Sequence, residues 1–332
     1  MRGMPQLLSA VAVVAVVAAG TSGAYDPVDF DRVIDEAVSA NYTIPDGERW
    51  LITPSGSVTG NQSVGVSRTG EIVVLGRLDM SSSSYVSRYA TGAGTVTVDE
   101  DGVLNVASRV PIARDGGTGT VKILGGEANF LGDCVFSFGQ GKADTATILQ
   151  SGGRSTFASN VYMAGWYTPQ NGTGRFAISG GEATFSGALR VGANPGTGTA
   201  RFEVIGAAPT VTVAGSLTLY AGSTLGFTIG AGGVSTIDVT SNAVSLLGGQ
   251  IDLALDGVTP AEGTTFDLIR SAGIDPQLVC LATGDAAAWA LQVNGAGDTL
   301  QAVYLVPEPA TAALLGLGLL VAARRRRAGA PV

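Results

Sequence analysis

One pattern occurs three times in succession in the middle of the chain: Thr120–Gly139 reads TVKILGGEANFLGDCVFSFG, Thr147–Gly165 reads TILQSGGRSTFASNVYMAG and Arg175–Gly192 reads RFAISGGEATFSGALRVG. The Gly-Gly pair and the phenylalanine that follows it recur at intervals of 27 and 28 residues. Self-similarity at such a period indicates a repeat architecture. Each copy contains three short runs of alternating apolar and polar residues, which predict three strands separated by turns.

Three strands and three turns per copy predict an all-β chain folded as a parallel β-solenoid, the right-handed β-helix. In such a fold each coil pairs with the coils above and below it at a spacing of ~4.8 Å. Like residues then stack in buried columns. The predicted columns are Val121/Ile148/Phe176/Phe202, Phe130/Phe157/Phe185 and Phe136/Met163/Val191/Leu219.

The repeat extends beyond the three clear copies, with a fourth at Phe202–Leu219 and fainter ones at Gly70–Met80 and Gly94–Val106. The predicted array spans residues 64–235. Gln150 interrupts the apolar column that contains Ile123 and Ile178. Since a buried amide needs hydrogen-bond partners, either Gln150 bonds to turn carbonyls inside the coil or this coil slips in register.

Both ends of a solenoid expose unpaired strands, so caps are expected. Residues 25–63 are predicted to form the first cap around an amphipathic helix at Asp29–Ala40. The residues of its apolar face are Phe30, Val33, Ile34, Ala37 and Val38, at helical spacing. Residues 236–305 lose the Gly-Gly repeat but keep alternation at Ile251–Leu255 and Thr265–Ile269, which predicts a β-rich second cap.

Composition excludes several kinds of chemistry. The 332 residues include 49 glycines and no histidine. Triads that use histidine, HExxH metalloproteases and zinc or haem held by histidine are therefore excluded. Cys134 and Cys280 are too few for a four-cysteine zinc site, although one long-range bridge stays open in an oxidising compartment. We expect no metal and no cofactor.

Residues 1–24 have the pattern of a signal peptide. Arg2 supplies the positive segment, Leu7–Ala19 the apolar segment, and Ser22-Gly23-Ala24 a small-residue cleavage site before Tyr25. This segment of 13 residues is too short for a membrane span of ~20. Export is the expectation.

A second targeting segment, after the signal peptide, is predicted at the C-terminus in residues 306–332. Pro307, Glu308 and Pro309 precede the apolar run Ala310–Ala323, and the basic cluster Arg324, Arg325, Arg326 and Arg327 follows it. The prolines bar a helix before Ala310, and the arginines hold the end on the cytoplasmic side of the membrane. An ordinary tail anchor is the alternative.

This order of segments resembles the PEP-CTERM sorting signal. The resemblance implies recognition by an exosortase-type membrane peptidase, with the Pro-Glu-Pro segment at the processing site, in bacteria that make exopolysaccharide. It also implies a C-terminal membrane segment, at least transiently. The Gly-rich copies are similar to the autotransporter-like β-helix repeats of such proteins, which implies a fold and an extracellular or cell-surface location but no activity.

Charge argues against nucleic-acid partners. Without Arg2, Glu308 and the four C-terminal arginines, residues 25–306 keep 14 basic and 26 acidic groups, a net charge of −12. Such a surface repels phosphate backbones.

Three sets of residues could carry a function. Glu127, Arg154 and Glu182 stack as acid, base and acid, which predicts a structural salt-bridge ladder, because the arginine separates the two carboxylates. Asp99, Glu100 and Asp101, with Arg109 and Arg114 near in sequence, are the best candidates for a polysaccharide lyase site, although the acidic run is typical of a solvated turn. Trp166 and Tyr167 are candidates for stacking on sugar rings.

The sequence thus predicts no catalytic residues. The leading hypothesis is an exported, non-enzymatic structural or adhesive protein of the cell surface or extracellular matrix, associated with exopolysaccharide or envelope components. The alternatives are a polysaccharide lyase or other carbohydrate-active β-helix enzyme, and a carbohydrate-binding module.

Overall fold

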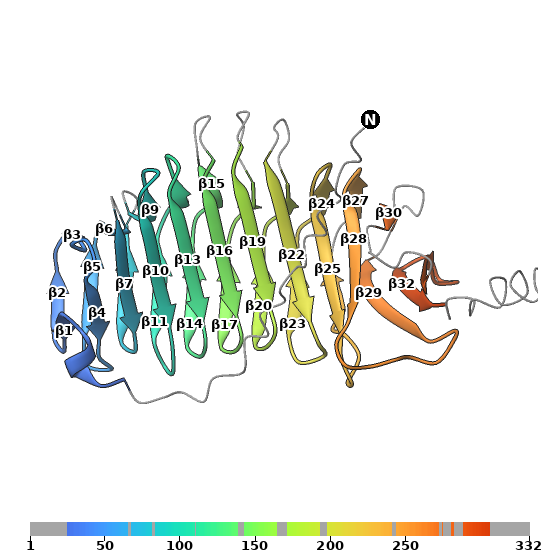
Figure 1. Ribbon diagram of the computed structural model, residues 1–332, viewed down its shortest axis with the longest axis horizontal. Coiled ribbons are helices and arrows are strands. Elements are labelled where there is room, and N and C mark those ends of the chain that lie inside the picture. Colours follow the sequence, from blue (N-terminus) through green and yellow to red (C-terminus); the bar gives the residue numbers. More distant parts are fainter. Residues whose placement is uncertain are drawn as a thin grey trace, which may run out of the picture.

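The chain folds as an elongated stack of coils, each built from three short strands (Figure 1). The computed structural model describes residues 25–65, 68–81, 84–109, 111–138, 143–164, 171–192, 198–240, 244–271, 274, 280–281 and 288–305. A 3₁₀ turn, η1 (Pro27–Asp29), precedes the first strand. The fold is the predicted all-β parallel solenoid.

Three sheets run along the stack, and each coil adds one strand to every sheet. Sheet 1 contains β1 (Arg32–Ile34), β4 (Arg49–Ile52), β7 (Thr69–Val74), β10 (Ala93–Val98), β13 (Thr118–Ile123), β16 (Thr145–Gln150), β19 (Thr173–Ile178), β22 (Thr199–Ile205), β25 (Thr224–Ile229), β28 (Gln250–Leu255) and β30 (Cys280–Leu281). Sheet 2 contains β2 (Ala37–Ser39), β5 (Ser57–Gly60), β8 (Arg77–Met80), β11 (Val103–Val106), β14 (Glu127–Phe130), β17 (Arg154–Phe157), β20 (Glu182–Phe185), β23 (Thr210–Val213), β26 (Ile237–Val239), β29 (Thr265–Ser271), β32 (Thr299–Tyr304) and β31 (Trp289–Val293). Sheet 3 contains β3 (Tyr42–Thr43), β6 (Gln62–Gly65), β9 (Tyr85–Arg88), β12 (Pro111–Arg114), β15 (Cys134–Phe138), β18 (Val161–Tyr162), β21 (Leu189–Val191), β24 (Leu217–Tyr220) and β27 (Val244–Leu247).

Strand pairing follows the predicted columns. Val121, Ile148, Phe176 and Phe202 are successive partners in sheet 1, and the register extends back through Val96. The members of all three predicted columns are buried. The parallel stack is longer than the predicted array of 64–235, because it begins at β1 and continues through β28.

The phenylalanine column of sheet 2 is a continuous stack of rings. The ring centroids of Phe130 and Phe157 lie 4.7 Å apart, and those of Phe157 and Phe185 lie 4.6 Å apart, with the planes within 5° of parallel. This distance matches the ~4.8 Å spacing between paired strands. Phe176 and Phe202 of sheet 1 meet the stack edge-on, so aromatic packing fills the centre of the solenoid.

The Gly-Gly pair forms the corner between sheet 1 and sheet 2. Gly126, Gly153 and Gly181 all have positive φ, between 48° and 75°. A side chain at Gly153 would also collide with the carbonyl oxygen of Gly125 on the preceding coil. Glycine is therefore required here both by backbone conformation and by the close approach of neighbouring coils.

Gln150 points inward without a change of register. It pairs with Ile123 on one side and Ile178 on the other, as the column predicts. Its Nε2 donates to the carbonyl oxygens of Glu182 at 2.9 Å and Gly153 at 3.4 Å, and Ser155 Oγ donates to its Oε1 at 2.7 Å. Of the two alternatives, bonding to turn carbonyls is correct.

The Gln150 network predicts a specific pattern of stabilities. Gln150→Leu should lower the free energy of unfolding by about 1–3 kcal/mol, because the buried Ser155 hydroxyl loses its acceptor. The double variant Gln150→Leu/Ser155→Ala should recover part of the loss, because no orphaned hydroxyl remains. Urea unfolding of the wild type, Gln150→Leu, Ser155→Ala and the double variant measures both the loss and the recovery of the free energy of unfolding. A single Gln150→Leu variant as stable as the wild type would contradict this account.

The predicted helix at Asp29–Ala40 is wrong, since these residues contain β1 and β2. Ile34, Val38 and Tyr42 turn toward the core from three successive short strands. A bend lies between each pair of these strands, so the core positions fall four residues apart and imitate a helix. Pairing with β4 and β5 satisfies the backbone instead.

The first coil is closed by a cation rather than a helix. Arg32 stands in the core-facing column with Trp50 and Ile72. Its guanidinium carbon lies 4.5 Å from the ring centroid of Trp50 and 4.6 Å from that of Tyr42, and its Nη2 donates to the Tyr42 hydroxyl at 3.1 Å. An inward-pointing charge on an edge strand disfavours the addition of another strand.

Replacing this cation should expose the end of the stack to association. We expect Arg32→Ile to sediment as larger species than the wild type at equal concentration, because an apolar side chain would extend the buried column to the open edge. Arg68→Ile, which removes the same charge from an exposed position outside the column, is the control. Equal sedimentation of Arg32→Ile and Arg68→Ile would refute the proposed role of Arg32.

The predicted β-rich C-terminal cap begins later than expected. Ile251–Leu255 belongs to β28 and pairs in parallel with β25. The cap proper comprises β29, β31 and β32, where β29 pairs in parallel with β26 and antiparallel with β32. Leu268, Ile269, Leu300 and Ala302 are buried within it.

Candidate functional site

The predicted charge ladder lies on the outer face of sheet 2. Glu127, Arg154 and Glu182 occupy equivalent positions on β14, β17 and β20. Arg154 Nη2 lies 2.9 Å from Glu182 Oε2, with both side chains about half exposed. Among the described residues, Arg154 forms its ion pair with Glu182 and not with Glu127. An exposed pair of this kind contributes ~0–1 kcal/mol to stability.

A second polar column on sheet 2 is more continuous. Asp79 accepts hydrogen bonds from Thr59 Oγ1 at 3.2 Å and Asn105 Nδ2 at 2.7 Å, and Asn129 Nδ2 donates to Asn105 Oδ1 at 3.0 Å. Burial raises the pKa of Asp79, but hydrogen bonds from Arg77, Asn105 and Thr59 outweigh it and lower the pKa overall. These contacts hold neighbouring coils in register and form a polar stripe.

The acidic run Asp99–Asp101 does not meet the arginines near it in sequence. It forms the corner between sheets 1 and 2, whereas Arg109 lies at the next corner and Arg114 ends β12 in sheet 3. The three corners of a coil face different directions. In the part of the chain that the structure describes, no three His, Cys, Asp or Glu side chains are grouped to hold a metal ion.

Asp99 instead anchors the segment that precedes the first coil. It is buried and accepts hydrogen bonds from the Glu100 backbone amide at 2.8 Å and the Tyr25 hydroxyl at 3.0 Å. Burial raises the pKa of Tyr25 to about 12, with further contributions from the hydrogen bond to Asp99 and the negative charges of Asp99, Glu71 and Glu100.

This contact predicts a pH dependence of stability. The folded-state pKa of Tyr25 lies above its ordinary value of 10.0. The contribution of the protonated Tyr25 hydroxyl to the free energy of unfolding is therefore fully present below pH 10 and is lost as the pH rises through about 12. The stability difference between the wild type and Tyr25→Phe should therefore shrink over this range. Urea unfolding at several alkaline pH values measures it, with Tyr220→Phe as the matched control. A difference that stays constant with pH would contradict the assignment.

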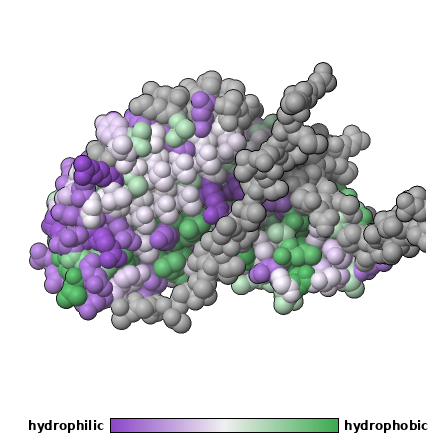
Figure 2. All heavy atoms as spheres, in the orientation of Figure 1, coloured by the Kyte–Doolittle hydropathy of each residue, from purple (hydrophilic) through white to green (hydrophobic). Residues whose placement is uncertain are grey.

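The largest convergence of charges on sheet 1 was not predicted from the sequence. Glu203 accepts from Arg175 Nε and Arg201 Nε, both at 2.6 Å, and Arg201 Nη2 donates to Asp252 Oδ2 at 2.7 Å. Figure 2 shows a hydrophilic patch in the middle of this face and another over its N-terminal coils, with nearly neutral residues between them. Burial lowers the pKa of Arg201, but its bonds to Glu203 and Asp252 raise it overall.

Gly226 makes this network possible. It lies on β25, between Glu203 on β22 and Asp252 on β28. A side chain at Gly226 would press against the Arg201 guanidinium, 3.0 Å from Nη2. Arg201 can therefore cross one whole coil to reach Asp252. Two arginines and two carboxylates neutralise each other in this network. This balance indicates a structural role in holding neighbouring coils together.

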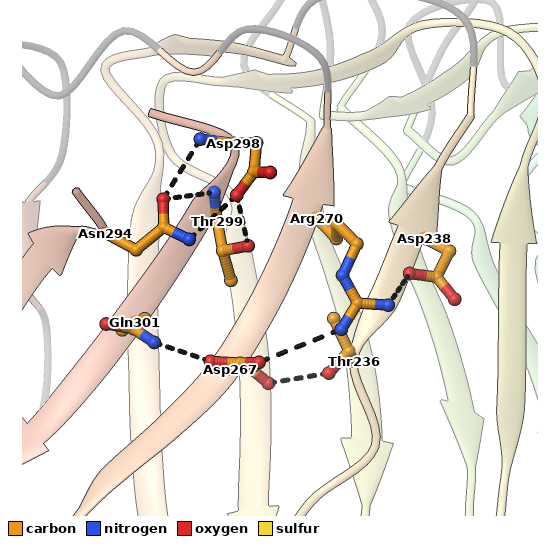
Figure 3. Close-up of polar contacts among 8 residues, drawn as sticks. All are labelled: Thr236, Asp238, Asp267, Arg270, Asn294, Asp298, Thr299 and Gln301. Carbon is orange, nitrogen blue, oxygen red and sulfur yellow. Dashed lines mark hydrogen bonds and ion pairs between the residues drawn. The ribbon is translucent and has the colours of Figure 1, made fainter. Parts of the chain in front are cut away.

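A further network joins the solenoid to the C-terminal cap (Figure 3). Arg270 Nη1 donates to Asp238 at 3.0 Å and its Nη2 lies 3.8 Å from Asp267. Asp267 also accepts from Gln301 Nε2 at 2.7 Å through its side chain and from Thr236 Oγ1 at 3.0 Å through its carbonyl. This network connects β26, β29 and β32 where sheet 2 changes from parallel to antiparallel pairing.

The hairpin between β31 and β32 is stabilised by its own side chains. Asn294 Oδ1 accepts from the amides of Asp298 and Thr299, and Asn294 Nδ2 and Thr299 Oγ1 donate to Asp298. The hydrogen bonds from Asn294 and then Thr299 lower the pKa of Asp298. These contacts fix the turn that reverses the chain (Figure 3).

Other predicted residues take no part in these networks or lie outside the described residues. Cys134 is a free, fully buried thiol, and burial followed by the charge of Asp133 raises its pKa. It lies on β15 in the middle of the stack and Cys280 on β30 at its end, so the bridge between them does not form. Trp166, Tyr167, the signal peptide at 1–24 and the tail at 306–332 lie outside the described residues.

Comparison with known proteins identifies the C-terminal segment. Residues 305–327 match the family model of the PEP-CTERM protein-sorting motif. The match includes Pro307, Glu308, Pro309 and the arginines at 324–327, and it starts one residue after β32 ends. No curated protein and no solved structure matches the chain.

The PEP-CTERM motif implies export, anchoring in a membrane before cleavage, and processing by an exosortase-type enzyme. Within the residues that the structure describes, no helix is both long and apolar enough to cross a membrane. The predicted apolar segment Ala310–Ala323 belongs to the tail that those residues do not include.

Proposed function

We propose that this chain is a non-enzymatic structural or adhesive protein of the bacterial cell surface or extracellular matrix, associated with exopolysaccharide. The observation that carries the proposal is the PEP-CTERM motif directly behind the last strand of a β-solenoid. Cleavage within the motif would release a folded body whose final strand is already paired with β29 and β31.

The surface of the solenoid supports a role in multivalent contact. Equivalent outward-facing positions recur on successive strands of sheet 2. Thr156, Thr184 and Thr212 continue the polar column of Asn105 and Asn129. A repetitive face can hold an extended partner through many weak contacts, which together exceed the affinity of any single one. Residues 25–306 carry a net charge of −12, which favours cations or polar glycans as binding partners over nucleic acid.

A polysaccharide-active enzyme is the second candidate, and one observation favours it. Arg175, Arg201, Glu203 and Asp252 gather arginines and carboxylates on one sheet face, as a lyase site would need. Their mutual ion pairs at 2.6–2.7 Å support the structural role instead. Release of unsaturated products from acidic polysaccharide by the wild type and not by Glu203→Gln would favour the enzyme.

Tail processing gives the direct test of the proposed function. In a host that contains an exosortase, the mature protein should lack Arg324–Arg327 and begin near Tyr25, as measured by intact mass spectrometry of the surface and culture fractions. Alanine replacement of Pro307, Glu308 and Pro309 should leave the protein unprocessed in the membrane. Deletion of residues 328–332, which lie outside the matched motif, is the control and should leave processing intact. A mature surface form that retains the whole tail would contradict the proposal.

A further inference from the structure

The turn between β31 and β32 contains an asparagine followed by a glycine, Asn294-Gly295. In such a pair the backbone nitrogen of the glycine can attack the side-chain carbonyl carbon of the asparagine, because the two atoms are placed in the chain to close a succinimide ring. Glycine favours this attack, since it has no side chain beside the nucleophilic nitrogen. Gly295 takes no part in the networks described above.

The side-chain amide of Asn294 is held with its carbonyl group polarised (Figure 3). Its Oδ1 accepts hydrogen bonds from the backbone amides of Asp298 at 3.1 Å and Thr299 at 3.2 Å. Its Nδ2 donates to Asp298 Oδ1 at 2.8 Å, which fixes the end of the amide that faces these two N–H groups. Two backbone donors on one carbonyl oxygen stabilise the negative charge that develops there when a nucleophile adds to the carbon, as in an oxyanion hole.

The backbone amide of Gly295 is available as the nucleophile. Among the described residues, no acceptor takes a hydrogen bond from this amide. The neighbouring amides are engaged, because that of Asn294 donates to the Thr299 carbonyl and that of Gly297 to the Asn294 carbonyl, both at 2.9 Å. Gly295 is also exposed, so its N–H group can lose its proton to solvent.

The fold does not require glycine at position 295. A Cβ added there would have no atom within 4 Å, and the φ angle of Gly295 lies outside the positive region. Gly297 differs, because its φ of 77° favours glycine. Alanine fits at position 295 without strain or collision, so the conformation of the turn does not explain this glycine.

We propose that Asn294 is a deamidation site whose reaction is promoted by the folded turn. The Gly295 nitrogen bonds to Asn294 Cγ, the bond from Cγ to Nδ2 breaks, and Nδ2 leaves as ammonia with the proton that the Gly295 nitrogen gives up. Water then opens the succinimide at either of its carbonyl carbons, which gives aspartate or isoaspartate at position 294. The reaction consumes only water, so the inference is independent of the proposed function.

The products weaken the end of sheet 2. With aspartate at position 294, the donor that now bonds to Asp298 is lost and a second carboxylate faces the first. Isoaspartate in addition lengthens the backbone between β31 and β32 by a carbon atom. Both changes disturb the hairpin that follows the last parallel pairing of this sheet. The deamidated protein should therefore melt at a lower temperature than the intact one.

Incubation of the purified full-length protein in mildly alkaline buffer tests the proposal. Peptide mapping by mass spectrometry measures the reaction at Asn294 separately from that at Asn171, the first residue of the other Asn-Gly pair. We expect Asn294 to react about tenfold or more faster in the folded protein than in guanidinium chloride, where the dipeptide is the same but the two amide donors are lost. An equal or slower reaction in the folded protein would overturn the inference.

Gly295→Ala is the matched variant, because it changes the nucleophile and leaves the turn intact. It should melt at the temperature of the wild type or slightly above, since alanine meets no atom and reduces the freedom of the unfolded chain. Its reaction at Asn294 should be about tenfold or more slower, because the methyl group hinders the approach of the nitrogen to Cγ. If Gly295→Ala melts as expected and reacts as fast as the wild type, the assignment of the Gly295 amide is wrong.

Discussion

Backbone pairing between consecutive coils determines where every other group of this protein lies. Each of the three sheets grows by parallel hydrogen bonding of a strand with its equivalent one coil later, so residues that occupy equivalent positions must stack. The spacing is set by the backbone and leaves no freedom to the side chains. Phenylalanine fits it because stacked rings prefer nearly the same separation, and glycine fits the corners because the next coil passes where a Cβ would stand.

This constraint explains how much could be predicted from the sequence. Where copies share residues at equal intervals, as at Phe130, Phe157 and Phe185, alignment alone predicts the register and the core. Near the N-terminus the step between equivalent residues falls to 18, between Arg32 and Trp50, and the strands shorten to two or three residues. Alternation is then too brief to show a period of two, which is why the first coil resembled a helix.

The candidate site was less predictable, because it depends on contacts between copies that differ. Arg201 reaches Asp252 only because Gly226 has no side chain at the intervening position on β25. This contact joins three different copies, so no single repeat predicts it. The polar column from Thr59 to Asn129 begins in a coil outside the predicted array and passes through its two fainter copies. In contrast, the sorting motif is a linear pattern that can be recognised without the fold, and the tail predicted at residues 306–332 overlaps the residues 305–327 that match the family model.

The two ends of the stack also have a consequence for the order of assembly. A coil contacts its immediate neighbours, so a chain that crosses a membrane from its N-terminus can add coils one by one to those already outside. The growing end stays a template for the next strand until β29 reverses its pairing from β26 to β32. That reversal uses the last strand before the matched tail, so sheet 2 ends in the antiparallel hairpin of β31 and β32 and not in another parallel coil. Sheet 2 therefore acquires its final order of strands only when β32 has emerged, while the segment behind it still lies at the membrane in the scheme proposed above.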